Sequence, residues 1–224
     1  MTKIRDNLQI IGANIEQYLA EYKCPKASVQ LLAVSKRHPS DKIKEAYEAG
    51  QRAFGENYVQ ELLDKKSQLH ELDIEWHFIG PLQSNKTKKI AEAANWVHAV
   101  DRLKIAQRLS EQRSETLAPL SICLQVNVSE ESSKSGLKPS EVVELALQIV
   151  KLPHLRLRGL MAIPAPEDDF EKQRKEVQQT FKSNDIDIEL DTLSMGMSND
   201  MEAAIAEGAT IVRIGTAIFG QRET

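Results

Sequence analysis

The sequence predicts an α/β fold: a (β/α)8 barrel, or TIM barrel, with an extra helix at its N-terminus. Eight short apolar segments alternate with helical segments along the 224 residues, a pattern that is typical of parallel βα units. The count of eight strands favours a closed barrel over the alternative, an open doubly wound sheet. That alternative is further disfavoured because no Gly-x-Gly-x-x-Gly motif follows the first strand. We expect a single domain over residues 1–224, with short loops, because this length is near the lower limit for the fold.

The chain is expected to begin with a helix that precedes the first strand. Its apolar residues repeat at intervals of three and four and form one stripe: Ile4, Leu8, Ile11, Ile15 and Leu19. The segment Cys24-Pro25-Lys26 ends this helix. Residues 29–35 then form an apolar run that predicts the first buried strand, and the run leads directly into Lys36.

Seven further apolar runs predict the remaining strands, which we expect at residues 52–56, 76–80, 96–100, 120–128, 155–163, 190–195 and 210–219. The helices between the strands are recognised by their start and stop residues. Helices are expected after Pro39, at Asn57, at Ser84, after an N-cap at Asp101, at Pro139, after the acidic residues 167–169, and at residues 198–200. The helix after residue 169 would carry Phe170, Val177 and Phe181 on one face, and residues 130–138 are expected to form a longer polar loop.

The composition argues against several classes of function. The formal net charge is −4, so the charge balance gives no indication of binding to nucleic acid or to an anionic membrane surface. No run of about 18 apolar residues predicts a transmembrane helix, and residues 1–6 lack the apolar core of a signal peptide. The two cysteines, Cys24 and Cys123, form no metal-binding or redox motif. We therefore expect a cytoplasmic protein in a reducing environment.

Polar residues follow the predicted strands, at the end of the barrel where active sites lie in this fold. Lys36 follows the first strand, where its ammonium group would be held beside a low-dielectric core. Such an environment lowers the pKa of a lysine and frees its amine for Schiff-base chemistry. The alternative is a lysine that only marks the end of a strand and points into water. The second strand contributes Asn57, and the third has His77 nearby.

The ends of the last two strands predict a phosphate site, because the loops after strands seven and eight commonly bind phosphate in this fold. Gly215 and Thr216 allow backbone N–H groups to approach an anion, and Ser198 supplies a hydroxyl group at an expected helix N-terminus. Arg213 points the same way as Gly215, and its charge needs a partner inside an apolar strand. The alternatives are a plain N-cap at Ser198, a packing glycine at Gly215 and a surface-facing Arg213.

A reactive lysine, a phosphate site and an inward arginine together indicate pyridoxal 5'-phosphate (PLP). This cofactor has an aldehyde for Lys36, a phosphate for the Gly215-Thr216 segment and a pyridine nitrogen for Arg213. An arginine donates to that nitrogen and keeps it unprotonated, which weakens the ring as an electron sink.

Several segments resemble the pyridoxal phosphate homeostasis protein family, also described as the YggS-like or proline synthetase co-transcribed homologue family. The similarity includes Leu-Ala-Val-Ser-Lys at 32–36 and Trp-His-Phe-Ile-Gly at 76–80. The matching segments follow in order over nearly the whole chain: 32–36, 54–61, 76–86, 159–161, 194–200 and 213–220.

The resemblance implies a barrel like the N-terminal domain of alanine racemase, which is fold type III among PLP proteins. It places Lys36 on the Schiff-base lysine, Arg213 on the residue that faces the pyridine nitrogen, and Asn57 near the cofactor ring. The phosphate-binding positions fall on Ser198, Gly215 and Thr216. Family members bind PLP, show no established catalytic turnover, are mostly monomeric, and influence vitamin B6 and amino-acid balance. We therefore expect a monomer that holds PLP and passes it transiently to apo-PLP enzymes.

A PLP-dependent amino-acid racemase is the main alternative function. A racemase of this fold needs a second acid or base on the far face of the substrate, supplied by an additional domain that we do not expect here. His77 or Tyr58 would have to replace it. A Schiff-base aldolase on the same barrel would use Lys36 but would leave Arg213 and the phosphate site unexplained. Lys134 is a candidate for a second PLP-accepting lysine, against the simpler role of a solvated loop residue.

Overall fold

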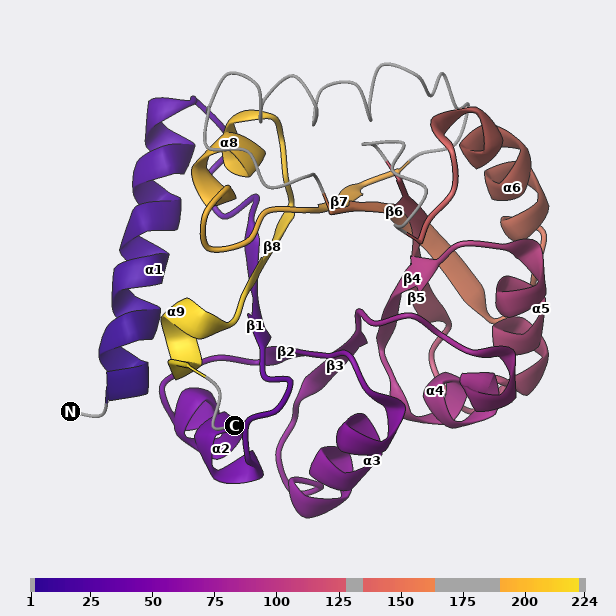
Figure 1. The fold of residues 1–224 in the computed structure, drawn as a ribbon, viewed down its shortest axis with the longest axis horizontal. Helices are drawn as coiled ribbons and strands as arrows, with labels where there is room; N and C mark the ends of the chain where they lie inside the picture. Colours follow the sequence, from indigo (N-terminus) through magenta and orange to yellow (C-terminus); the bar gives the residue numbers. More distant parts are fainter. Residues whose placement is uncertain (1–2, 128–134, 164–189, 222–224) are drawn as a thin grey trace.

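The computed structural model describes residues 3–127, 135–163 and 190–221, and its strands form a closed parallel barrel (Figure 1). The strands follow one another in sequence order, and β8 pairs with β1 to close the barrel. They are β1 (Gln30–Val34), β2 (Ala53–Glu56), β3 (Glu75–Phe78), β4 (Trp96–Val100), β5 (Leu120–Val126), β6 (Leu155–Ala162), β7 (Thr192–Ser194) and β8 (Ile211–Ile214). The predicted (β/α)8 barrel is therefore confirmed.

Helices surround the barrel, as Figure 1 shows. They are α1 (Lys3–Glu21), α2 (Ser40–Glu48), α3 (Val59–Gln68), α4 (Thr87–Ala93), α5 (Leu103–Gln112), α6 (Val142–Ile149), α8 (Met201–Ala206) and α9 (Thr216–Phe219), with 3-10 turns η1 (Ser84–Lys86) and η2 (Pro139–Glu141). The expected helix with Phe170, Val177 and Phe181 lies outside the described residues, as do residues 130–134 of the expected loop. None of the described helices is long and apolar enough to span a bilayer.

The predicted N-terminal helix is confirmed as α1. Four residues of its apolar stripe are buried: Ile4, Ile11, Ile15 and Leu19. The helix packs against α2, α8 and α9, and the amide Nδ2 of Asn7 donates to the carbonyl oxygen of Ile218 over 2.8 Å. It thereby covers the part of the barrel where β8 meets β1.

The expected strand over residues 210–219 is too long, because β8 ends at Ile214 and residues 216–219 form the short helix α9. The backbone N–H groups of Ile218 and Phe219 both donate to the carbonyl oxygen of Gly215, at 2.9 and 3.0 Å. Both side chains are buried, so an apolar run continues through the change from strand to helix. Periodicity alone cannot distinguish a buried strand from a buried helical turn in so short a run.

The expected N-cap of α5 is also wrong. The N-cap of α5 is Arg102 rather than Asp101, whose carboxylate instead accepts hydrogen bonds from the Arg102 guanidinium at 2.9 and 3.1 Å. The helix start expected at residues 198–200 is confirmed, because the N-cap of α8 is Asp200. Ser198 is therefore not the N-cap and lies in the loop that precedes the helix. In that loop the Asp200 carboxylate accepts from the Met197 backbone N–H, which leaves the Ser198 side chain at the rim of the barrel.

Buried apolar residues fall into two clusters on opposite faces of the strands. The larger cluster packs the strands against the helices and includes Ala33 and Val212. The smaller cluster has Leu32 and Ile211, their neighbours in sequence, which alternation directs into the barrel. Arg213, two residues after Ile211, is directed to this interior as well and is buried.

Candidate functional site

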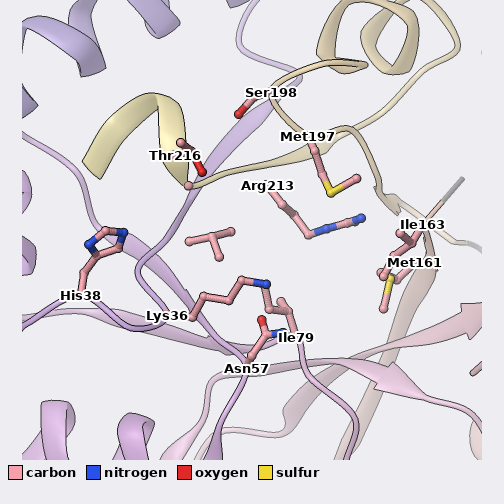
Figure 2. Close-up of a pocket in the computed structure, with 12 residues that line it drawn as sticks. Lys36, His38, Asn57, Ile79, Met161, Ile163, Met197, Ser198, Arg213 and Thr216 are labelled. Atoms are coloured by element: carbon pink, nitrogen blue, oxygen red, sulfur yellow. The ribbon is translucent and has the colours of Figure 1, made fainter. Parts of the chain in front are cut away.

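A cleft of about 180 Å³ lies at the carboxyl ends of the strands (Figure 2). All six residues that the sequence singled out line it: Lys36, Asn57, Ser198, Arg213, Gly215 and Thr216. Val34, His38, Ile79, Met161, Ile163 and Met197 complete its walls. The residues come from the ends of six different strands and the loops that follow them, so closure of the barrel brings them together.

Lys36 lies in a tight turn two residues after the end of β1. The turn is held to β2 because the Ser35 N–H donates to the carbonyl oxygen of Gly55 at 3.0 Å. It closes through a bond from the His38 N–H to the carbonyl oxygen of Ser35, also at 3.0 Å, with Arg37 at a φ of 60°. Figure 2 shows the Lys36 side chain extended into the cleft, with its amine near the Asn57 side chain.

A buried polar network supports this turn from below. The Ser35 hydroxyl donates to Glu56 Oε1 at 2.6 Å, and Lys65 Nζ donates to the same oxygen at 2.7 Å. Lys65 also donates to the Ser35 carbonyl oxygen at 2.9 Å and to Glu61 Oε2 at 3.1 Å. Glu61 in turn accepts a bond from the Arg37 N–H at 2.9 Å. The residues on both sides of the predicted lysine are therefore fixed to one network.

The two carboxyl groups of this network titrate differently. Burial raises the pKa of Glu56 to about 7, against the opposing effects of Lys65 and Ser35. Burial also opposes ionisation of Glu61, but hydrogen bonds, first from the Arg37 N–H, lower the pKa of this group below its usual value. Glu56 has no exposed surface, whereas the Glu61 side chain is about 30% exposed. The deeper burial of Glu56 thus explains why its pKa is raised while that of Glu61 is lowered.

Asn57 directly follows β2 and has an unsatisfied side chain. Its Oδ1 is buried and accepts no hydrogen bond from any described residue. A glycine at position 80 keeps this segment in place, because a Cβ there would overlap the Asn57 carbonyl oxygen and lie 2.8 Å from its Cα. Leaving a buried acceptor unsatisfied costs about 1–3 kcal/mol, so Oδ1 is ready to accept a bond from a ligand.

Arg213 projects from β8 into the base of the cleft and is only 6% exposed. Its Nη1 donates to the Ser194 carbonyl oxygen and, at 2.9 Å, to Ser194 Oγ, while Nη2 donates to the Ala162 carbonyl oxygen at 2.8 Å. Burial lowers the pKa of the guanidinium to about 10, so it remains protonated at neutral pH. The alternative of a surface-facing arginine is wrong, and the partners expected for a buried charge are carbonyl and hydroxyl oxygens.

The residues of the predicted phosphate site lie at the other end of the cleft. In Figure 2, Ser198 and Thr216 are on the side opposite Lys36 and Asn57. A Cβ at Gly215 would lie 3.1 Å from the Val34 carbonyl oxygen, so glycine lets β8 pass close to the end of β1. Gly215 also has an ordinary negative φ of −117°, which shows that space rather than backbone strain favours glycine here.

Four lining residues were missed in the sequence: Val34, His38, Ile79 and Ile163. His38 is buried, and its ring lies 5.2 Å from the Phe219 ring, which comes from the opposite end of the chain. Its only signal was its position two residues after Lys36. His77, considered earlier, lies instead in the barrel interior, and Asn127 lines a neighbouring cleft that shares Asn57. Lys134 is outside the described residues.

Comparison with known proteins identifies relatives over the full chain. The family model for the N-terminal domain of alanine racemase matches residues 7–223. A pyridoxal phosphate homeostasis protein from Pseudomonas aeruginosa is 54% identical over 224 residues, which cover 100% of this chain and 97% of that protein. The protein of the same name from Escherichia coli K12 is 50% identical and covers 100% of this chain and 98% of its own length.

Solved structures share the fold. PipY of Synechococcus elongatus, in a structure with PLP bound, is 38% identical, with a TM-score of 0.78 over 92% of this chain and 100% of that one. Alanine racemase of Clostridium difficile is 15% identical, with a TM-score of 0.72 over 98% of this chain and 58% of that one. At that identity the second similarity concerns the fold alone.

Proposed function

The chain belongs to the pyridoxal phosphate homeostasis protein family, within the wider family of the alanine racemase N-terminal domain, and from this premise we propose that it binds PLP in the cleft. The observation that carries the proposal is that one cavity is lined by Lys36, by Arg213 and, at its other end, by the hydroxyl-bearing residues Ser198 and Thr216. PipY is 38% identical to this chain, and its structure with PLP bound supports PLP as the ligand of the cleft.

The residues of the cleft fit the cofactor chemically. Asn57 Oδ1 is a buried acceptor without a described partner, and the Arg213 guanidinium is a protonated donor. The hydroxyl groups of Ser198 and Thr216 are suited to a phosphate, at the end of the cleft away from Lys36. The cofactor's aldehyde and its phosphate-bearing methylene arm are attached to neighbouring ring carbons, and the cleft offers an amine for the aldehyde and hydroxyl groups that the arm can reach.

Each residue has a defined task in this proposal. PLP, when bound, supplies an aldehyde that condenses reversibly with amines and a ring that withdraws electrons. Lys36 Nζ is the amine that would hold it as a Schiff base, and the network under the turn keeps that residue in position. Arg213 would face the pyridine nitrogen as a hydrogen-bond donor. Because a guanidinium only donates hydrogen bonds and cannot accept one from a protonated ring nitrogen, it would keep that nitrogen unprotonated and the electron sink weak.

We propose a regulatory carrier rather than an enzyme. The substitutes considered for a racemase's second acid or base do not line the cleft: Tyr58 is about half exposed with its hydroxyl near Arg37, and His77 is in the barrel interior. Among the described lining residues, His38 is the other candidate base beside Lys36. The carrier would act in the cytoplasm as a monomer and pass PLP to apo-PLP enzymes. The name shared by the relatives supports a role in PLP homeostasis.

An absorbance titration with PLP tests binding, and an amino-acid racemase assay tests the alternative. The protein should develop the yellow absorbance of a protein-bound Schiff base at one equivalent of PLP, with no racemisation of L-alanine above that of free PLP. Failure to bind PLP would refute the proposal. Sustained turnover that Lys36→Ala abolishes, and that the exposed control Lys104→Ala leaves intact, would favour the racemase instead.

A further inference from the structure

A series of hydrogen bonds crosses the barrel interior and ends at Arg213. From the outside inward, Glu75 Oε1 lies 2.7 Å from His77 Nε2, and His77 Nδ1 lies 2.9 Å from His98 Nε2. His98 Nδ1 lies 2.8 Å from Ser194 Oγ, which accepts from Arg213 Nη1 at 2.9 Å. Both histidines have no exposed surface. The series connects the start of β3, at the amino end of the barrel, with the cleft at the carboxyl end.

The two ends of the series fix its direction. A guanidinium only donates and an ionised carboxylate only accepts. Ser194 therefore accepts from Arg213 and can pass its own hydrogen to His98 Nδ1. His98 then donates from Nε2 to His77 Nδ1, and His77 donates from Nε2 to Glu75. In this arrangement every link has one donor and one acceptor, and both imidazole rings are neutral with the proton on Nε2.

The charges around the series agree with this assignment. Burial lowers the pKa of both histidines, and electrostatic repulsion from the neighbouring His77 site and from the Arg213 cation further disfavours a charged His98. The hydrogen bond from His77 lowers the pKa of Glu75, so this carboxylate is ionised. His77 stacks on Trp96 at 5.4 Å, and Arg158 lies over that same ring at 4.8 Å while pairing with Asp191.

The other titratable groups near Arg213 are Asp200, whose negative charge opposes the lowering of the arginine's pKa, and Cys123. Burial raises the pKa of its thiol to about 12, so it carries no charge that would neutralise the arginine. None of the described carboxylates forms an ion pair with Arg213. Glu75 is the carboxylate that the hydrogen-bonded series reaches.

We propose that Ser194, His98, His77 and Glu75 are positioning residues for Arg213. Their hydrogen bonds all run in one donor-to-acceptor direction, from Arg213 to Glu75, and this chain, called the relay below, orients the guanidinium at the base of the cleft. Nη1 is held by Ser194 and Nη2 by the Ala162 carbonyl oxygen, which fixes the plane of the group. Three of its five N–H groups are thereby used, and the other two donate to none of the described residues. Because Ser194 passes its own hydrogen onward, its oxygen is a stronger acceptor for Arg213. The consequence for ligand binding rests on the proposed function, whereas the direction of the relay does not.

Nitrogen-15 NMR of the ligand-free protein tests the direction of the relay. His77 and His98 should both give the signals of neutral rings protonated on Nε2 from pH 5.5 to 8. A charged ring, or a proton on Nδ1 of either residue, would overturn the relay. Ser194→Ala should shift the Nδ1 signal of His98, because that atom loses its donor. The control Thr192→Val removes a hydroxyl from the same strand whose bond goes to Asp191, and should leave both rings unchanged.

PLP affinity tests the effect on Arg213. Ser194→Ala should weaken PLP binding about fivefold, the loss expected for one polar contact, while Thr192→Val should not. Glu75→Gln, which changes only the distant end, should weaken binding about twofold, and the exposed control Glu71→Gln should leave it unchanged. Equal affinities in Ser194→Ala and the wild type would overturn the positioning role. A wild-type protein that fails to bind PLP would instead refute the proposed function, and the NMR result would still decide the relay.

Discussion

Lys65 Nζ lies 2.7 Å from Glu56 Oε1, in an ion pair whose side chains are 7% and 0% exposed. Neither residue lines the cleft, yet both bond to Ser35 beside Lys36. A buried ion pair adds little net stability, but removal of one partner leaves an uncompensated charge. The pair therefore connects the stability of the fold with the position of the predicted cofactor lysine.

Removing the cation of this pair should be costly. Lys65→Met should lower the free energy of unfolding by about 3–5 kcal/mol at pH 8, measured by urea denaturation. The loss should be smaller at pH 5, where Glu56 can take up a proton. The exposed Lys88→Met should change stability by less than about 0.5 kcal/mol. Equal effects of the two substitutions would show that the pair does not support the turn.

The raised pKa of Glu56 predicts a pH dependence of stability. Its pKa is about 7 in the folded protein and 4.5 in the reference state, so the folded chain holds a proton that the unfolded chain releases. This stabilising contribution is full below pH 4.5 and is lost as the pH rises through about 7, with a slope of at most about 1.4 kcal/mol per pH unit. Glu56→Gln should remove that slope.

Glu61→Gln is the matched control, since the pKa of Glu61 is lowered. Ionised Glu61 stabilises the fold above the reference pKa of 4.5, and this stabilisation is lost as the pH falls. Glu61→Gln should therefore leave the dependence of stability on pH above about pH 5 unchanged. A wild-type slope that survives in Glu56→Gln would assign the titration to another group. Thermal denaturation at a series of pH values provides the measurement.

Gly80 should be essential for the position of Asn57. A methyl group at residue 80 would overlap the Asn57 backbone, so Gly80→Ala should displace Asn57 and weaken PLP binding by at least about tenfold. Gly12→Ala adds a methyl group in α1 with no atom within 4 Å and should keep PLP affinity while raising stability by about 0.5–1 kcal/mol. Normal affinity in Gly80→Ala would mean that the loop can move without consequence.

Asn57 itself should show opposite effects on binding and on stability. Asn57→Ala removes a buried acceptor that no described residue satisfies, so the ligand-free protein should be no less stable than the wild type. PLP affinity should fall about tenfold, because the bond that the ligand provides is lost. Calorimetric titration and urea denaturation measure the two quantities. A parallel loss of both would make Asn57 a structural residue rather than a ligand contact.

The barrel and the composition of the cleft were accessible from the sequence because they depend on local patterns. Each buried strand is a short apolar run, and the fold directs the residue after each run to one end of the barrel. Lys36 and Arg213 could be placed in this way. The change from β8 to α9 could not, since the apolar run from Ile211 to Phe219 does not reveal where the strand ends.

The polar networks were not predictable because they depend on contacts between distant residues. His98 and Ser194 are 96 positions apart, and their bond exists only because the barrel closes with a particular register. His77 was considered as a substitute catalytic base, whereas closure of the barrel directs it toward His98. Similarly, Lys65 is a charged residue on a helix, and nothing in its local sequence distinguishes it from the exposed lysines.

The attachment site of PLP on the wild-type protein provides the most direct test. The protein is incubated with one equivalent of PLP, reduced with borohydride, digested and mapped by mass spectrometry. The added mass should lie on the peptide that contains Lys36, with one label per chain. The control variant Lys104→Ala should give the same map. A label that lies mainly on another lysine, or a protein that gains no mass, would contradict the assignment of Lys36 as the residue that holds the cofactor.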